Sequence, residues 1–476
     1  MMDSQALISE KLKDQQLREN LLKGMNLLKT NRKNLLKDRY GDWEALREEG
    51  RKVKESALAR LPELLERFEQ NASKNGIKVH WADTPQEVNE IIHKIAQEKG
   101  ATTILKGKSM ASEEIHFNHY WESKGAKAIE TDLGEIIIQL IDERPVHIVV
   151  PAIHKNRYEI GEIFEKHLKV ERFSEPEDLN RVARTYLRSE FKEFKMGLSG
   201  VNFVIADEGA IWLLENEGNG RMSTTAPDVH VAVCGIEKIV ETFDDAVILD
   251  TLLVPSATGQ SITCYNNIIT SPRKDGDKDG PKEVHVVLFN NHRTDILAHK
   301  HYAKALSCIR CGTCMNHCPV YEKIGGHAYG ATYPGPIGEV ISPQLFGIDK
   351  YGYVLNLCSL CGRCSEVCPV KIPLAEMIRD LRAEQVGDGS GEKILGIERV
   401  KPKISEKLSF KAFASVATTP WAWRLALSSA GTLAPLLKVL SGVLPALKQW
   451  TSCRAFPDLD SSFQRKVKEM KGVVYE

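Results

Sequence analysis

Eight cysteines of this chain fall into two runs with the same spacing. The first run is Cys308-x2-Cys311-x2-Cys314-x3-Cys318, the second is Cys358-x2-Cys361-x2-Cys364-x3-Cys368, and a proline follows each. This spacing is typical of proteins that hold two [4Fe-4S] clusters, in which the fourth cysteine of each run binds the other cluster. The sequence therefore predicts two [4Fe-4S] clusters and one-electron transfer. The expected ligands are Cys308, Cys311, Cys314 and Cys368 for one cluster, and Cys358, Cys361, Cys364 and Cys318 for the other.

Two other interpretations of the cysteines are open. A zinc site needs only two C-x2-C pairs, so the third cysteine of each run, the Cys-Pro pairs and the duplication would be surplus. A disulfide framework belongs to exported proteins, and the chain starts MMDSQALISEKLKDQQ without an apolar stretch. We therefore expect a cytoplasmic protein. Cys234, Cys264 and Cys453 stand alone and are expected to be small apolar side chains rather than ligands.

Length and charge limit the class of protein. A chain of 476 residues exceeds what one hydrophobic core usually serves, which predicts two or three domains. Its 64 Lys and Arg residues balance 64 Asp and Glu residues, so no overall field attracts nucleic acid. The longest apolar stretch, residues 425–437, has 13 residues and cannot span a bilayer. Any membrane contact would therefore be peripheral and made through a complex.

Four segments of different texture divide the chain. Residues 1–70 are charged and helical in pattern, 71–294 alternate short strands and helices, 295–390 hold the cysteine runs, and 391–476 form an apolar helical segment. The expected strands cover residues 77–81, 102–106, 146–150, 201–207, 210–216, 229–235 and 246–254, with a last strand at VHVVLF. Alternating strands and helices followed by contiguous apolar strands predict an α/β domain with a largely buried sheet.

The two segments after the α/β domain are predicted to be mainly helical. Thirty-nine residues rich in Gly, Pro and Tyr separate Cys318 from Cys358. This is more than a minimal bacterial ferredoxin needs, so we expect a ferredoxin-like module with this insert wrapped over the clusters. In the C-terminal segment, Pro435 and Pro445 are expected to interrupt helices that carry Trp421, Trp423 and many leucines, Leu444 and Leu447 among them. That segment should cover the cluster module or a partner; a membrane surface is the weaker alternative.

Two polar groups in the α/β segment are candidates for a small-molecule site. Gly107-Lys108-Ser109 is no P-loop, because Thr102 stands where the first glycine is required, but Lys108 could hold a carboxylate or phosphate. The stretch ENEGNGR offers Arg221 as an anion clamp and Glu215 or Glu217 as acid, base or nucleophile. A surface lysine and a structural turn are equal alternatives. His230, inside an apolar strand, is expected to be a core histidine.

Several stretches resemble the lactate utilisation protein B family: ENEGNGR, GIEKIV, SATGQSIT, HAYGATYPGPIG and CSLCGRCSEVCPVKIP. The resemblance runs from about residue 50 to the C-terminus. It implies a lactate-utilisation (LUD) domain, similar in fold to α/β proteins of the CoA-transferase and sugar-phosphate-isomerase group, followed by two [4Fe-4S] clusters. It also implies a role in oxidising L-lactate to pyruvate together with two sister proteins, one of them cysteine-rich. No catalytic residues of the LUD domain are carried over.

The residues narrow the mechanism further. No G-x-G-x-x-G stretch follows a strand, so the sequence shows no nicotinamide or flavin site of Rossmann type. Lactate oxidation releases two electrons, whereas a [4Fe-4S] cluster carries one electron and accepts no hydride. We therefore expect an electron-transfer subunit of a cytosolic oxidoreductase complex whose hydride acceptor lies elsewhere. Two rival hypotheses are that the LUD domain is itself an enzyme acting on a carboxylate or CoA ester, with sensing or structural clusters, and that the chain is a scaffold.

Overall fold

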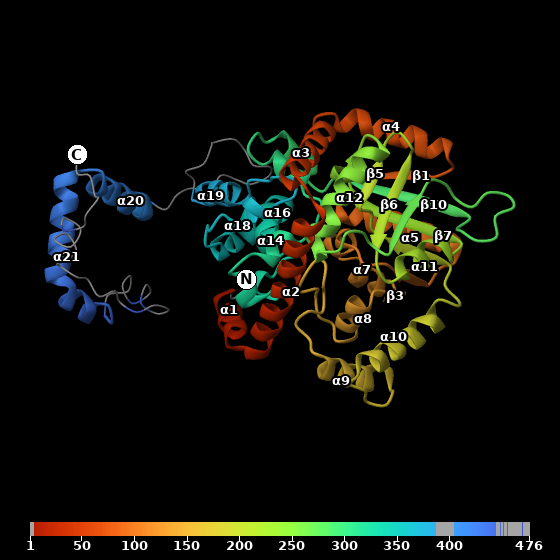
Figure 1. The fold of residues 1–476 in the computed structure, drawn as a ribbon, viewed down its shortest axis with the longest axis horizontal. Helices are drawn as coiled ribbons and strands as arrows, with labels where there is room; N and C mark the ends of the chain where they lie inside the picture. Colours follow the sequence, from red (N-terminus) through yellow and green to blue (C-terminus); the bar gives the residue numbers. More distant parts are fainter. Residues whose placement is uncertain are drawn as a thin grey trace. The chain divides into compact units, whose positions relative to one another are not determined.

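The computed structural model describes residues 4–386 and 404–443 and the single residues 448, 451, 455 and 469. The chain divides into two compact units, Met1–Val400 and Lys401–Glu476. The first unit holds the sheets and all eight cysteines of the two runs, and the second unit is helical (Figure 1). None of the helices among the described residues is long and apolar enough to cross a membrane.

A six-stranded parallel sheet forms the centre of the first unit. Its strands, in spatial order, are β1 (Lys78–Ala82), β10 (Glu283–Phe289), β7 (Val229–Gly235), β4 (Met196–Ser199), β2 (Thr103–Lys106) and β3 (Lys127–Glu130). Every neighbouring pair in it is parallel. All residues of β4 and β7 are buried, as expected for a sheet covered on both faces. The predicted α/β domain with a largely buried sheet is confirmed.

The first unit also contains a smaller sheet, whose strands fall between β4 and β10 in the sequence. It contains β8 (Ile239–Val240), β5 (Phe203–Ile205), β6 (Ala210–Glu215) and β9 (Tyr265–Ile269), in that order. β5 and β8 pair in parallel, whereas β6 is antiparallel to both β5 and β9. The helices of this region are α5 (Pro85–Lys99), α6 (Met110–Glu114), α7 (Phe117–Ser123), α8 (Leu133–Leu140), α9 (Arg157–Leu168), α10 (Pro176–Glu190), α11 (Asn219–Thr225), η1 (Ile236–Lys238), α12 (Phe243–Thr258) and α13 (Arg293–Ala298).

Two of the expected strands are wrong. Residues 246–254 belong to helix α12, which starts at a capping box of Thr242 and Asp245 and ends at Gly259 in the left-handed region. The helix is mostly apolar and largely buried because α2 and α3 pack against it as well as strands β5 and β8. Residues 146–150 form a loop, since the amides of Val149 and Val150 both donate to Nδ1 of His147 and close a turn.

The cysteine runs lie in a region of short helices. These are η2 (Ala303–Ser307), α14 (Thr313–Asn316), α15 (Tyr321–Ile324), η3 (His327–Tyr329), α16 (Gly335–Phe346), α17 (Ile348–Tyr351), η4 (Gly352–Leu357), α18 (Arg363–Val367) and α19 (Leu374–Gln385). Its apolar side chains share one hydrophobic core with α12 and the N-terminal helices. The cysteine region and the sheets therefore belong to one folded body.

The N-terminal helices join the two regions. They are α1 (Ser4–Lys13), α2 (Gln15–Arg39), α3 (Trp43–Ala59) and α4 (Leu61–Lys74). Helix α2 passes between α12 on one side and α14 and α15 on the other (Figure 1). Arg47 of α3 donates two hydrogen bonds, of 2.7 and 3.0 Å, to the backbone oxygen of Cys368. This charged segment therefore packs on the cysteine region.

The second unit contains α20 (Ile404–Ala417) and α21 (Pro420–Leu440), which pack against each other. The predicted helical C-terminal region is confirmed, but Pro435 does not interrupt its helix, because α21 runs through it. Phe413 and Trp423 meet edge to face, yet Trp421 is 70% exposed and Ile404 78% exposed. Leu444, Pro445, Leu447 and Cys453 lie outside the described residues.

Candidate functional site

The two cysteine runs fold in the same way. The second residue after each first cysteine, Arg310 or Leu360, has a positive φ of 62° or 54°. Its backbone amide donates to the sulfur of that cysteine, at 3.4 Å for Cys308 and 3.3 Å for Cys358. Such a conformation is strained for residues other than glycine, and strain of this kind gathers at functional sites. The turns aim backbone donors at sulfur, which is how proteins tune iron–sulfur clusters.

Four thiols from both runs line one small hollow. They are Cys308, Cys311, Cys314 and Cys368, and the other lining side chains are mostly apolar, with Ile148, Ile337 and Leu374 among them. Burial raises the pKa of the Cys368 thiol to about 11. Burial also raises the pKa of Cys314 well above its usual value, and the neighbouring Cys308 and Cys311 thiols add to this. Thiols so placed are unfavourable as free thiolates but suit iron, which binds and neutralises them.

The other thiols form a more exposed group. Burial, with the Glu339 carboxyl beside it, raises the pKa of Cys358 to about 12. Cys358 and Cys318 interact electrostatically, and so do Cys364 and Cys358. Cys361 is exposed to solvent. Two groups of thiols therefore differ in access to water, one enclosed and one open at Cys361.

A polar cavity of about 350 Å³ lies in the same unit. Its walls include Gly107 and Gly200, which directly follow β2 and β4, and Glu237, two residues after the end of β7. The carboxyl ends of parallel strands are the usual place for ligands in open α/β sheets. Arg310, from between Cys308 and Cys311, lines the cavity as well. The first cysteine turn therefore faces the cysteine hollow with its sulfurs and the cavity with its arginine.

A buried chain of charges closes the cavity beside this turn. Arg293 binds both carboxylate oxygens of Glu114 at 2.8 Å and donates through Nε to Glu237 at 2.5 Å. Nη2 of Arg310 lies 3.3 Å from the other Glu237 oxygen. Burial would raise the pKa of Glu237, but Arg293 and Arg310 lower it to about 2. Glu237 is therefore a carboxylate at neutral pH, and in the chain Glu114, Arg293, Glu237, Arg310 each carboxyl group contacts at least one arginine.

One cation beside this chain of charges, Lys238, makes no close ion pair among the described residues, although the Glu237 carboxylate acts on it electrostatically. Among the residues that the structure describes, Lys238 makes no hydrogen bond or ion pair, although it lines the cavity. Burial lowers its pKa to about 8, and Arg310 contributes to the lowering. Burial makes the charged form of this ammonium group less favourable, and an anionic ligand in the cavity would stabilise that form.

The structure brings together three of the four α/β residues proposed from the sequence. Lys108, Glu215 and Glu217 line the cavity, whereas Arg221 is exposed and does not line it. The Glu215 carboxylate accepts the amides of Gly220 and Arg221 at 2.6 and 2.5 Å, so it holds the start of α11. Glu215 therefore stabilises this turn and Arg221 lies outside the cavity lining, and a binding or catalytic role for either residue stays a prediction.

Lys108 and Glu217 each make one hydrogen bond to the backbone. Nζ of Lys108 donates to the backbone oxygen of Val149 at 2.5 Å. Glu217 accepts the amide of Leu133 at 3.1 Å, and burial raises its pKa. His230 is a core histidine, as expected, with Nε2 2.8 Å from Oγ of Ser199. Lys238, Glu237 and Arg293 were not predicted as site residues from the sequence. The one signal for them was Arg310, a charged residue between Cys308 and Cys311.

Comparisons with known proteins agree with this arrangement. Residues 65–289 match the LUD domain family, residues 304–372 the 4Fe-4S dicluster domain, and residues 380–473 the C-terminal domain of lactate utilisation protein B. Lactate utilization protein B of Bacillus licheniformis is 41% identical over 88% of this chain and 86% of its own length. The chain belongs to the lactate utilisation protein B family. It is therefore an iron–sulfur protein of lactate utilisation, as the resemblance implied.

Other relatives support the same family. Lactate utilization protein B of Geobacillus sp. strain WCH70 is 41% identical over 88% of this chain and 87% of its own length. The "Uncharacterized electron transport protein YkgF" of Escherichia coli strain K12 is 37% identical over 96% of this chain and 94% of its own length. A crystal structure of a DUF162 family protein from Deinococcus radiodurans covers 48% of this chain at 14% identity and a TM-score of 0.29, a likeness too weak to carry an argument.

Proposed function

We propose that this chain is the electron-transfer subunit of a cytoplasmic complex that oxidises L-lactate to pyruvate. The single observation that carries the proposal is the hollow in which three cysteines of the first run meet Cys368 of the second. The match to a 4Fe-4S dicluster domain supports two clusters, and the names of the relatives support lactate as the substrate of the system. Cys308, Cys311, Cys314 and Cys368 would hold the first cluster, and Cys318, Cys358, Cys361 and Cys364 the second, in a ferredoxin-like arrangement.

The surroundings suggest a direction for the electrons. The first set of thiols is enclosed and shares its turn with the cavity wall through Arg310. In the second set Cys361 is exposed, and Leu360 beside it is 41% exposed. Electrons would enter at the enclosed cluster and leave at the exposed one. When bound, each cluster supplies one-electron chemistry, so a pair can divide the two electrons of lactate.

The rest of the reaction needs partners. No [4Fe-4S] cluster accepts hydride, so the hydride acceptor would belong to one of two sister proteins, one of them cysteine-rich. The exposed apolar helices α20 and α21 are the proposed docking element for that cysteine-rich partner. Exposed apolar surface of this extent is typical of a protein–protein contact.

The polar cavity favours a second candidate function. Lys238 and Arg310 form a cationic end beside the first cysteine turn, and the cavity lies where α/β proteins of the CoA-transferase and sugar-phosphate-isomerase group would bind ligands. In this alternative the LUD domain itself acts on a carboxylate or CoA ester. L-lactate would then lose its electrons within this chain.

One experiment separates the two candidates. The anaerobically reconstituted chain, without partners, is mixed with L-lactate, and the visible absorbance of the clusters is followed. The electron-transfer proposal predicts about eight iron atoms per chain and no bleaching until the sister proteins are added. Bleaching by L-lactate alone would favour an active site in this chain. Zinc in place of iron and acid-labile sulfide would end both.

A further inference from the structure

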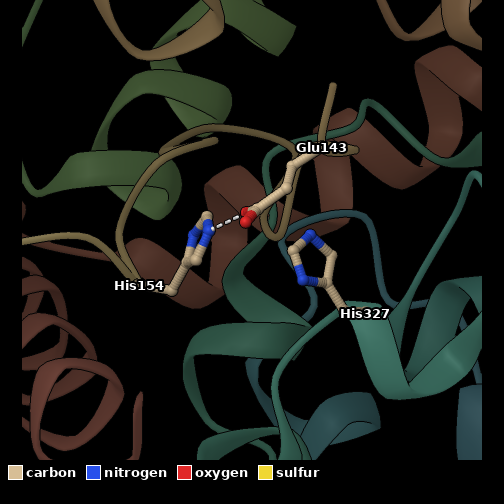
Figure 2. Close-up of side chains that lie close together, drawn as sticks. All are labelled: Glu143, His154 and His327. Carbon is tan, nitrogen blue, oxygen red and sulfur yellow. Dashed lines mark hydrogen bonds and ion pairs between the residues drawn. The ribbon is translucent and has the colours of Figure 1, made fainter. Parts of the chain in front are cut away.

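A second group of metal-binding side chains lies outside the cysteine runs. Glu143 and His154 come from the loop between α8 and α9, and His327 begins η3 in the insert between the runs (Figure 2). One ligand atom of each residue lies within 4.8 Å of the other two. Two imidazoles and one carboxylate are a common donor set of zinc centres with three protein ligands.

The hydrogen bond of His327 leaves one of its ring nitrogens with a lone pair. Its Nε2 lies 2.6 Å from the backbone oxygen of Arg144. A carbonyl oxygen only accepts hydrogen bonds, so Nε2 carries the proton and Nδ1 keeps its lone pair. Burial lowers the pKa of His327, which keeps the ring neutral near pH 7. Metal-binding histidines usually donate their other ring N–H to such a carbonyl or carboxylate.

Glu143 and His154 face each other in the loop. Nε2 of His154 lies 2.6 Å from Oε2 of Glu143, as Figure 2 shows. Lys155 donates to the other oxygen, Oε1, at 2.8 Å. Burial opposes ionisation of Glu143, but these hydrogen bonds hold its pKa at about 2, so it is a carboxylate at neutral pH. Nδ1 of His154 is buried without a partner among the described residues, so Nε2 is the ring nitrogen that faces Glu143.

We propose that Glu143, His154 and His327 bind one Zn²⁺ ion. Zinc would take the place of the hydrogen that Nε2 of His154 shares with Oε2 of Glu143. The neutral imidazole would then carry its one proton on Nδ1. Zinc bonds of about 2.0–2.2 Å place tetrahedral ligand atoms about 3.4 Å apart, so the side chains need to move by on the order of 1 Å. Glu143 and His327 are only partly buried, which gives the ion a route in and leaves a fourth position for water.

Such an ion would tie together two segments that reach the cysteines. The loop that carries Glu143 and His154 also carries Ile148, which lines the cysteine hollow. The segment that carries His327 follows Tyr321, whose hydroxyl donates to the backbone oxygen of Val146 in that loop. Zinc would therefore fix the loop that shields the first set of thiols, without serving as a ligand of the clusters.

The test uses the full chain with both clusters reconstituted. Zinc chloride is added anaerobically, excess is removed, and zinc, iron and acid-labile sulfide are measured in the same sample. We expect about one zinc per chain in the wild type and in the control His167→Gln, an exposed histidine of α9. Glu143→Gln and His327→Gln should bind zinc at least about 100-fold more weakly with unchanged iron, because even outer-shell changes cost 10–100-fold. Zinc should also slow amide hydrogen exchange in residues 143–155 of the wild type and of His167→Gln, but not of Glu143→Gln or His327→Gln.

Two outcomes would overturn the proposal. One is equal zinc content in the wild type and His327→Gln, which would place the ion elsewhere. The other is zinc uptake only with loss of iron, which would place it at the cysteines. Neither outcome bears on electron transfer, since the clusters are counted separately in the same sample.

Discussion

Glu237 is the carboxylate that should matter most for stability near the first cysteine turn. It is 2% exposed and is bound by Arg293 and Arg310. The Glu237→Gln substitution keeps the volume but leaves Arg293 with only Glu114 and Arg310 with no carboxylate. Lowering a pKa from 4.5 to about 2 corresponds to about 3 kcal/mol of folding free energy at neutral pH. Breaking a buried ion pair by removing one partner costs about 3–5 kcal/mol, which agrees.

The assay is anaerobic urea unfolding of the cluster-loaded chain, followed by far-ultraviolet circular dichroism. The matched control is Glu241→Gln, because Glu241 also binds two arginines, Arg60 and Arg67, but at the surface. That control should cost under about 1 kcal/mol. A cost for Glu237→Gln no larger than for Glu241→Gln would refute the reasoning.

The pH dependence gives a second check on Glu237. A carboxyl whose folded pKa is lowered stabilises the protein fully above its unfolded pKa of about 4.5 and loses this as pH falls toward its folded pKa of about 2. From pH 5 to pH 8 the difference between wild type and Glu237→Gln should therefore stay constant. A difference that disappears between pH 8 and pH 6 would show that another group carries the effect.

Three further predictions concern the clusters, the cavity and the tail. Cys311→Ser, in the enclosed set, should lower iron from about eight to about four per chain; loss of all iron or of none would contradict separate ligand sets. Lys238→Met should abolish binding of L-lactate or phosphate to the cavity in calorimetry, while the exposed Arg221→Ala should not; equal binding by both variants would remove the cavity from the account. Deleting residues from 404 onward should leave the iron in place but abolish co-purification with the sister proteins, and a truncated chain that still binds them at full strength would make the tail a cover only.

The iron–sulfur chemistry and the buried sheet could be predicted because their signals are local. A complete C-x2-C-x2-C-x3-C-P run has few alternative uses, and strands such as residues 229–235 are continuous and apolar. Residues 246–254 misled for the same reason, since an apolar run fits a buried helix as well as a buried strand. The capping pair Thr242 and Asp245 was the signal that distinguishes them.

The rest depends on contacts between distant parts of the chain. Residues 146–150 look like a strand, but His147 turns the backbone toward the cysteine region, where it meets Asn316. Nothing in the sequence around Lys238 marks it as a site residue. It becomes a candidate only in the fold, where burial and the nearby Arg310 lower the pKa of its ammonium group. The spacing of the first cysteine run predicts iron–sulfur chemistry. It does not predict that Arg310, within this run, lines the cavity at the ends of the parallel strands.

The central claim is that electrons from lactate pass through the clusters of this chain. The most direct measurement is rapid-freeze electron paramagnetic resonance of the anaerobic complex, this chain with its sister proteins, after mixing with L-lactate. The account predicts signals of reduced [4Fe-4S] clusters that rise as pyruvate forms and that lose the enclosed-cluster component in Cys311→Ser. Pyruvate formation at an undiminished rate while both clusters of this chain stay oxidised would contradict it.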